Sequence, residues 1–206
     1  MVAASLPSQP PPTDPRFPNL RADVVAGYLN ATETQRAEVI CGELSITSLP
    51  NPRHALTMGN LHVALRSPFH RACDGPGGWM FLMAAEFHLG PKPDILIPDL
   101  AGWRRERVPA DFFADDAPDH IALTPDWICE ILSDATEAKD RGRKRRIYSR
   151  EGVRHYWIVD PRDRTLEVYR LDDGRWRELD THAGDAVVRA EPFDAIELDL
   201  SDLWKL

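Results

Sequence analysis

The stretch that decides the fold is residues 125–161, PDWICEILSDATEAKDRGRKRRIYSREGVRHYWIVDP. The apolar run at 126–132 predicts a strand, and HYWIVD at 155–160 predicts a second one. Between them, residues 135–151 predict a helix, which Gly152 would end because glycine readily adopts the left-handed conformation. Further strands and helices alternate on both sides of this stretch. The sequence therefore predicts an α/β fold of mixed (α+β) order, with helices packing on a central β-sheet.

The bulk composition is that of one folded domain. The chain has 206 residues and 43% hydrophobic content, enough for a substantial core. Residues 1–19 are rich in proline and predict a disordered arm, so the single domain is expected over 20–206. Residues 101–125 predict a long surface loop.

Neither a membrane nor an oxidising compartment is indicated. No apolar run approaches the roughly 18 residues that a membrane span needs, and the N-terminus lacks the pattern of a secretory signal. The three cysteines form no CxxC pair, so neither a disulfide framework nor a zinc site is expected. A cytoplasmic location fits these features best.

Two acidic residues stand in apolar segments. Asp94 lies in PKPDILIPD, at the head of an expected strand over 94–98, and Glu130 lies in the middle of the strand over 126–132. A buried carboxylate is costly unless something compensates it. If the two strands are neighbours, the carboxylates can converge, and Mg²⁺ would bridge them and activate water for attack on a phosphodiester. The alternative is structural, with one acid capping a turn and the other paired with a buried arginine.

The helix that follows is strongly basic, although the net charge of the chain is −8. Asp140, Lys144 and Tyr148 lie at i, i+4 and i+8 and share one helix face. Lys144 could therefore contact an attacking water, or could simply pair with Asp140. The neighbouring arginines are expected to hold DNA phosphates, or to form a solvated face; they are Arg141, Arg143, Arg145 and Arg146.

A third acidic element is available for the same site. Glu38 and Glu43 lie in AEVICGEL, and Glu86 lies in AAEFHL. Any of the three could join the metal as a further ligand or as an outer base. His54 precedes a predicted helix and is expected to cap it or pack against it.

Five segments follow one another along the chain: AEVICGEL, PD with an apolar strand, EILS, D…K…Y and HYWIVDP. In this order they resemble the Uma-two family over roughly residues 20–204. The resemblance implies a restriction-endonuclease-like core of the PD-(D/E)XK type, with a mixed sheet flanked by helices and a divalent metal. Asp94 would match the PD aspartate and Glu130 the second acid. Leu132 stands where the plain pattern has lysine, and Lys144 is the matching position on the helix. Glu38 resembles the acid of the first motif.

These observations predict a Mg²⁺- or Mn²⁺-dependent endonuclease that hydrolyses DNA. The expected metal ligands are Asp94, Glu130 and Glu38, with Lys144 acting on the water and on the charge of the transition state. An inactive nuclease fold that binds nucleic acid or protein is the alternative, and a hydrolase using an acid/base pair on another substrate is the third reading. A second copy of the chain is a candidate partner, because cutting two strands favours two sites related by symmetry.

Overall fold

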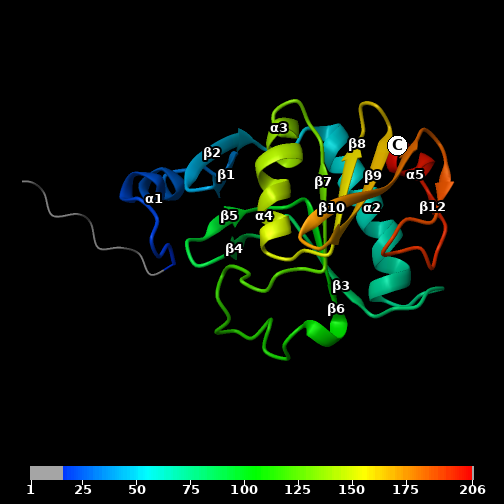
Figure 1. Cartoon of the computed structure of the whole chain (residues 1–206), viewed down its shortest axis with the longest axis horizontal. Helices are drawn as coiled ribbons and strands as arrows, with labels where there is room; N and C mark the ends of the chain where they lie inside the picture. Colours follow the sequence, from blue (N-terminus) through cyan, green and yellow to red (C-terminus); the bar gives the residue numbers. More distant parts are fainter. Residues whose placement is uncertain (1–15, 206) are drawn as a thin grey trace, which may run out of the picture.

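The computed structural model describes residues 16–205. A six-stranded sheet and a four-stranded sheet form its framework, and the helices pack around them (Figure 1). The described helical segments are α1 (Ala22–Leu29), α2 (Pro52–Leu65), η1 (Arg66–His70), η2 (Arg105–Arg107), α3 (Glu137–Lys139), η3 (Asp140–Lys144), α4 (Arg145–Arg150) and α5 (Ser201–Trp204). The described strands are β1 (Gln35–Ile40), β2 (Glu43–Ser48), β3 (Trp79–Met83), β4 (Phe87–Leu89), β5 (Asp94–Leu96), β6 (Leu100–Arg104), β7 (Trp127–Ile131), β8 (His155–Asp160), β9 (Thr165–Asp172), β10 (Arg175–Ala183), β11 (Val187–Val188) and β12 (Leu198–Asp199).

The larger sheet is mixed and has the order β10-β9-β8-β7-β6-β3. Its central pair, β7 and β8, is parallel, and the other pairs are antiparallel. Parallel neighbours need a crossover connection, and the continuous helical run from α3 through η3 to α4 supplies it. The strand, helix and strand expected over 125–161, and the mixed sheet flanked by helices, are confirmed.

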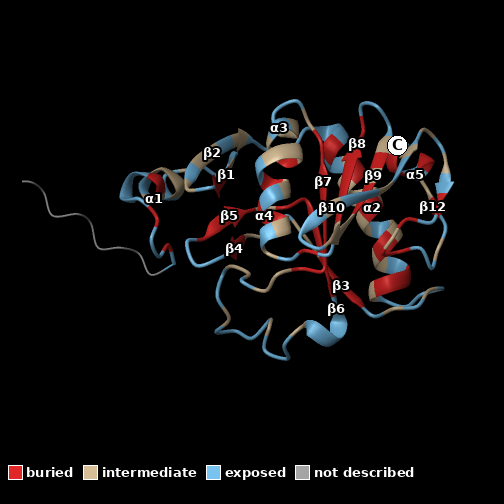
Figure 2. Ribbon diagram, in the orientation of Figure 1, coloured by how far each residue is buried: buried red, intermediate tan, exposed pale blue. Residues whose placement is uncertain are grey.

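Alternation along β7 assigns the two faces of this sheet. Trp127, Cys129 and Ile131 belong to one core cluster, which includes residues of α2 and of the C-terminal segment. Ile128 belongs to a second cluster on the other face, together with residues of α4. Figure 2 shows β7 and β8 as buried. Both faces of this sheet are therefore covered, and Glu130 lies in the wholly buried central strand on the α4 side.

The smaller sheet has the order β2-β1-β5-β4. Its β1–β2 hairpin turns at Cys41 and Gly42, both with positive φ (56° and 78°), as a two-residue hairpin of the primed type requires. β5 pairs with β1 and β4, and the chain then passes into β6 of the larger sheet. Residues 97–99 thus join the two sheets.

The loop expected over 101–125 begins instead as a strand. β6 pairs with β3 on one side and with β7 on the other. A side chain at Gly102 would come within about 3.0 Å of the Phe81 ring and 3.2 Å of the Trp127 ring. The packing around this strand therefore requires glycine at position 102. The glycine permits close packing here and does not interrupt the strand.

The N-terminal arm is only partly covered by the structure. Residues 1–15 of the arm expected over 1–19 lie outside the described residues. Phe17 is buried, and its ring lies 5.5 Å from that of Tyr28 and 5.7 Å from that of His88. The packed part of the described chain therefore begins close to Phe17. Among the described helices, none combines the length and apolar character that crossing a membrane requires.

Candidate active site

The site is a buried group of carboxylates around one lysine. Glu130 lies near the end of β7, and Asp99 directly precedes β6. Leu100 pairs with Cys129, so Asp99 lies at the end of β6 beside β7, and the backbone N–H of Ile131 in β7 donates to its Oδ2. Glu38 of β1, Asp99, Glu130 and Asp140 of η3 are each no more than 2% exposed.

Lys144 lies at the centre of this group. Its Nζ is 2.8 Å from Glu38 Oε1, 3.1 Å from Glu130 Oε1 and 3.3 Å from Asp140 Oδ1. The Tyr148 hydroxyl donates a hydrogen bond to the same Glu130 oxygen. The helix face shared by Asp140, Lys144 and Tyr148 is thus turned to the sheet. Asp140 and Lys144 belong to the π-helical turn η3, and π-turns within helices are frequent at functional sites.

Asp99 is held by three donors. Arg36 Nη1 donates to Oδ1 at 2.9 Å, and the backbone N–H of Ile131 donates to Oδ2 at 2.7 Å. His54 Nε2 lies 3.0 Å from Oδ2. Asp99 therefore links β6 to β7, to Arg36 of β1 and to His54 of α2.

Burial and charge set the protonation of the group. Burial raises the pKa of Glu130 to about 8; Lys144 opposes this rise, and the nearby Asp140 and Asp99 add to it. Burial also raises the pKa of Glu38, but Lys144 and Arg36 outweigh it, so that pKa is lowered overall. Burial therefore favours the protonated form of Glu130, whereas Lys144 and Arg36 favour the ionised form of Glu38.

Asp94 does not converge with Glu130, which corrects the expectation that their strands are neighbours. β5 belongs to the smaller sheet and β7 to the larger. Asp94 Oδ1 accepts a hydrogen bond from the backbone N–H of Cys41 in the hairpin turn, and Oδ2 accepts one from Arg150 Nη2 at 2.7 Å. Asp94 thus ties the turn to the end of α4, which is the turn-capping alternative that its sequence context left open.

The three other acidic candidates have different surroundings. Glu38 joins the cluster, whereas Glu43 is exposed and pairs with Arg143. Glu86 accepts hydrogen bonds from the Tyr28 hydroxyl and from the His88 ring. Of the three candidates for a further acidic residue, only Glu38 contacts Lys144.

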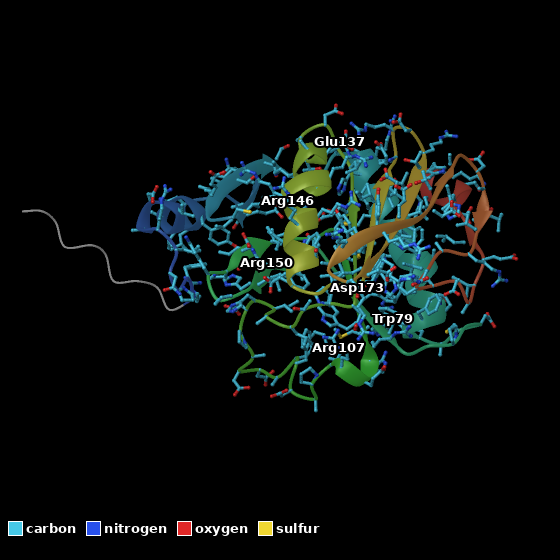
Figure 3. The ribbon with its side chains drawn as sticks, in the orientation of Figure 1. Trp79, Arg107, Glu137, Arg146, Arg150 and Asp173 are labelled. Atoms are coloured by element: carbon cyan, nitrogen blue, oxygen red, sulfur yellow. The ribbon has the colours of Figure 1, made fainter. Side chains whose placement is uncertain are left out.

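The arginines of the helix are mostly committed to protein partners. Arg141 binds Glu167 and Glu137, and Arg143 binds Glu43. The Arg145 guanidinium lies over the Tyr169 ring, 4.2 Å from its centroid. Arg146 is exposed and has no hydrogen bond or ion pair within the described residues. Figure 3 shows Glu137, Arg146 and Arg150 along the helix of α3 and α4. A DNA-binding surface made by all four arginines would have to break these contacts, and only Arg146 is available as it stands.

The donor chemistry of Asp99 and Glu130 fits a hard divalent cation. Both offer carboxylate oxygens, which hard divalent cations prefer as ligands. Asp140 Oδ1 is buried and accepts no hydrogen bond from the described residues. Within residues 16–205, however, no three acidic, histidine or cysteine side chains are already arranged as a set of ligands. The lysine, arginine and histidine of the protein itself now hold the oxygens that a metal would take.

A hollow of about 200 Å³ opens beside the cluster. Arg36 and His54, both in contact with Asp99, form part of its lining. A second hollow, of about 460 Å³, shares Asn51 and Ser133 with it. Arg36 and His54 therefore lie between the first hollow and Asp99.

Asp99 and Arg36 were missed from the sequence. The segment PKPDILIPD contains two PD dipeptides, Pro93–Asp94 and Pro98–Asp99. The second directly precedes the strand that pairs with β7, and this position is the signal that could have identified Asp99. Arg36 carries no motif, and its role depends on how β1 is placed against Asp99.

Comparisons with known proteins agree with this architecture. Residues 25–201 match the Uma2 (Uma-two) family, which is described as "Putative restriction endonuclease". Among solved structures, a "putative nuclease belonging to DUF820" from Anabaena variabilis ATCC 29413 matches with a TM-score of 0.64 and 20% identity, over 87% of this chain and 96% of that one. No curated protein matched. The chain belongs to the Uma2 family of restriction-endonuclease-like proteins.

Proposed function

We propose that the protein is a metal-dependent endonuclease that hydrolyses phosphodiester bonds in DNA. One observation carries the proposal: Asp99, directly before β6, and Glu130, in the paired strand β7, are both buried, and Lys144 Nζ lies 3.1 Å from Glu130 Oε1. Two carboxylates and a lysine in this arrangement are suited to metal-assisted attack of water on a phosphodiester. Membership of a family described as restriction endonucleases supports the same activity.

Asp99 and Glu130 would hold Mg²⁺ or Mn²⁺, with the carbonyl oxygen of Ile131 as a further ligand. The metal would polarise the phosphate and lower the pKa of a bound water. Asp99 thus takes the place first expected for Asp94. The His54 and Arg36 contacts to Asp99 would have to open for this to happen.

Lys144 would position the water and offset the negative charge that develops on the phosphoryl oxygens. Burial lowers the pKa of Lys144, but Glu130, Glu38 and Asp140 outweigh burial and raise it overall. Lys144 is therefore a fixed cation at neutral pH, so we assign it charge stabilisation and orientation rather than proton abstraction. Glu38 and Asp140 hold it in place.

An inactive binding scaffold is the second candidate. It is favoured by the ion pairs within the cluster, because Lys144 binds both Glu38 and Glu130 directly. The position of Leu132, where the plain nuclease motif has lysine, points the same way. Such a protein would bind metal or DNA without turnover.

A nicking assay on supercoiled plasmid, with Mg²⁺ or Mn²⁺ and with EDTA, separates the two candidates. The nuclease proposal predicts metal-dependent nicking that Glu130→Gln and Asp99→Asn abolish. Arg175→Met, at an exposed position of β10, serves as a control for a lost positive charge outside both the carboxylate cluster and the basic helix. Metal binding by calorimetry without nicking by the wild-type protein would favour the scaffold.

Two further properties stay predictions. A cytoplasmic location fits the sequence, and a homodimer would supply two sites for the two strands of a duplex. Analytical ultracentrifugation with and without a DNA duplex would measure the oligomeric state.

A further inference from the structure

The hollow beside Asp99 has features that the hydrolytic step leaves unexplained. Its volume is about 200 Å³, far above the roughly 15 Å³ that one water molecule needs. Its polar lining includes Arg36, Asn51, His54, Ser133 and Thr136. A space of this size and polarity at the edge of a carboxylate cluster can take a ligand group.

Arg36 presents unused donors here. Its side chain is 10% exposed, and only Nη1 is engaged, with Asp99. Nε and Nη2 are buried and have no hydrogen-bond partner within the described residues. Arginine keeps its proton in proteins, and buried donors without an acceptor are costly. The edge formed by Nε and Nη2 has the geometry to bind two oxygens of one phosphate group.

The N-terminus of α2 adds positive potential at the same hollow. Asn51 caps this 14-residue helix by accepting a hydrogen bond from the backbone N–H of His54, and both residues line the hollow. A helix N-terminus favours a bound anion. The hydroxyls of Ser133 and Thr136, which are hydrogen-bonded to each other at 3.1 Å, also line the hollow.

Asp134 is the carboxylate among the lining residues of the hollow; its side chain is 93% exposed and is bound by Arg162. Asp134 is therefore neutralised by Arg162, and no hydrogen bond joins it to Arg36 among the described residues. Arg53, which lines the adjoining hollow, is exposed and has no hydrogen bond or ion pair in the part of the chain that the structure describes.

We propose that this hollow is a phosphate-binding subsite, formed by Arg36, the N-terminus of α2 and the hydroxyls of Ser133 and Thr136. Building on the proposed function, the ligand is a phosphate of the nucleic-acid strand next to the one that is cleaved. Arg36 and His54 contact Asp99 directly, so only one layer of side chains separates this phosphate from the metal-binding carboxylates. The subsite would fix the strand by its backbone and read no base sequence.

The test uses metal-free protein and inorganic phosphate, at constant ionic strength kept with chloride. Backbone amide NMR shifts are followed in wild-type, Glu130→Gln and Arg36→Lys proteins, with Arg175→Met, at an exposed position of β10, as a control on exposed charge. We expect saturable shifts at residues 51, 53, 54 and 133–136 in the first two proteins and in the control. Arg36→Lys keeps the charge beside Asp99 but loses the forked edge, so phosphate affinity should fall at least about tenfold.

Ser133→Ala is a second variant, which tests the subsite if Arg36→Lys does not fold; it should weaken phosphate binding about two- to fivefold. Shifts that never saturate, or equal affinity in a folded Arg36→Lys protein, would overturn the subsite. Saturable phosphate binding by a protein that never nicks DNA would retain the subsite and reject the nuclease. Metal-dependent nicking without phosphate binding in the hollow would retain the nuclease and reject the subsite.

Discussion

Replacing Lys144 by methionine tests whether the buried lysine holds the carboxylate cluster together. Methionine is apolar and similar in length, so packing is largely kept while the ammonium is lost. Glu38, Glu130 and Asp140 would then lose a cation at 2.8, 3.1 and 3.3 Å. Removing one partner of a buried ion pair costs about 3–5 kcal/mol. Because typical domains are stable by about 5–15 kcal/mol, Lys144→Met should be strongly destabilised at pH 8 and still measurable.

The loss should depend on pH in a defined direction. Without Lys144, burial raises the folded-state pKa of each carboxyl above its unfolded value near about 4. A raised carboxyl pKa lowers stability as pH rises through the window between the unfolded and folded values. Lys144→Met should therefore recover part of its stability between pH 8 and pH 5.5, because the carboxyls take up protons and need no counter-charge.

Urea unfolding followed by circular dichroism measures both effects. Arg146→Met is the matched control, since it removes a positive charge from an exposed position on the same helical run, with no partner in the described chain. The double variant Lys144→Met/Glu130→Gln should regain about 1–3 kcal/mol relative to the single one, because neighbouring sites in one network couple. Equal stability of Lys144→Met and wild type at pH 8, or a further loss of stability at pH 5.5, would refute the reasoning.

Three shorter predictions concern the same region. Asp99→Asn should abolish metal-dependent nicking, whereas Asp94→Asn should cost about 1–3 kcal/mol of stability and leave the nicking activity of the folded protein intact; plasmid nicking and urea unfolding on the same samples decide. In metal-free protein, carboxyl ¹³C NMR should show the Glu130 carboxyl titrating near its raised pKa of about 8. The free energy of unfolding should fall as pH rises towards that value, because the folded state keeps a proton that the unfolded state releases. Gly102→Ala should destabilise by about 1–3 kcal/mol through overpacking against the Phe81 ring, 3.0 Å from the added carbon, and thermal unfolding would measure it.

Local pattern was enough to find three residues of the cluster. Glu130 stands in an apolar run that could only be a strand, and Lys144 stands on the helix face that also carries Asp140. Glu38 lies in a strand that alternates before a tight turn. Each of these positions depends on short-range periodicity, which the sequence records directly. The fold class followed from the same periodicities.

Short-range periodicity could not predict which strands pair when they are far apart in the sequence. Whether Asp94 or Asp99 faces Glu130 depends on which segment pairs with β7, and the two dipeptides are only five residues apart. The arginines of the helix raise the same difficulty, because their partners come from remote strands: Glu167 is in β9 and Glu43 is adjacent to the turn of the first hairpin. Charge counted along the chain overestimated the positive surface, since it did not include carboxylates brought in from elsewhere.

Asp99 connects the two proposed binding events. In the structure, Arg36 contacts it through Nη1 and lines the hollow at the same time. A phosphate that draws the Arg36 guanidinium into the hollow would release an Asp99 oxygen for a metal. Metal binding at Asp99 would likewise release Arg36 for the phosphate. Binding free energies are reciprocal, so each ligand must strengthen the other by the same factor.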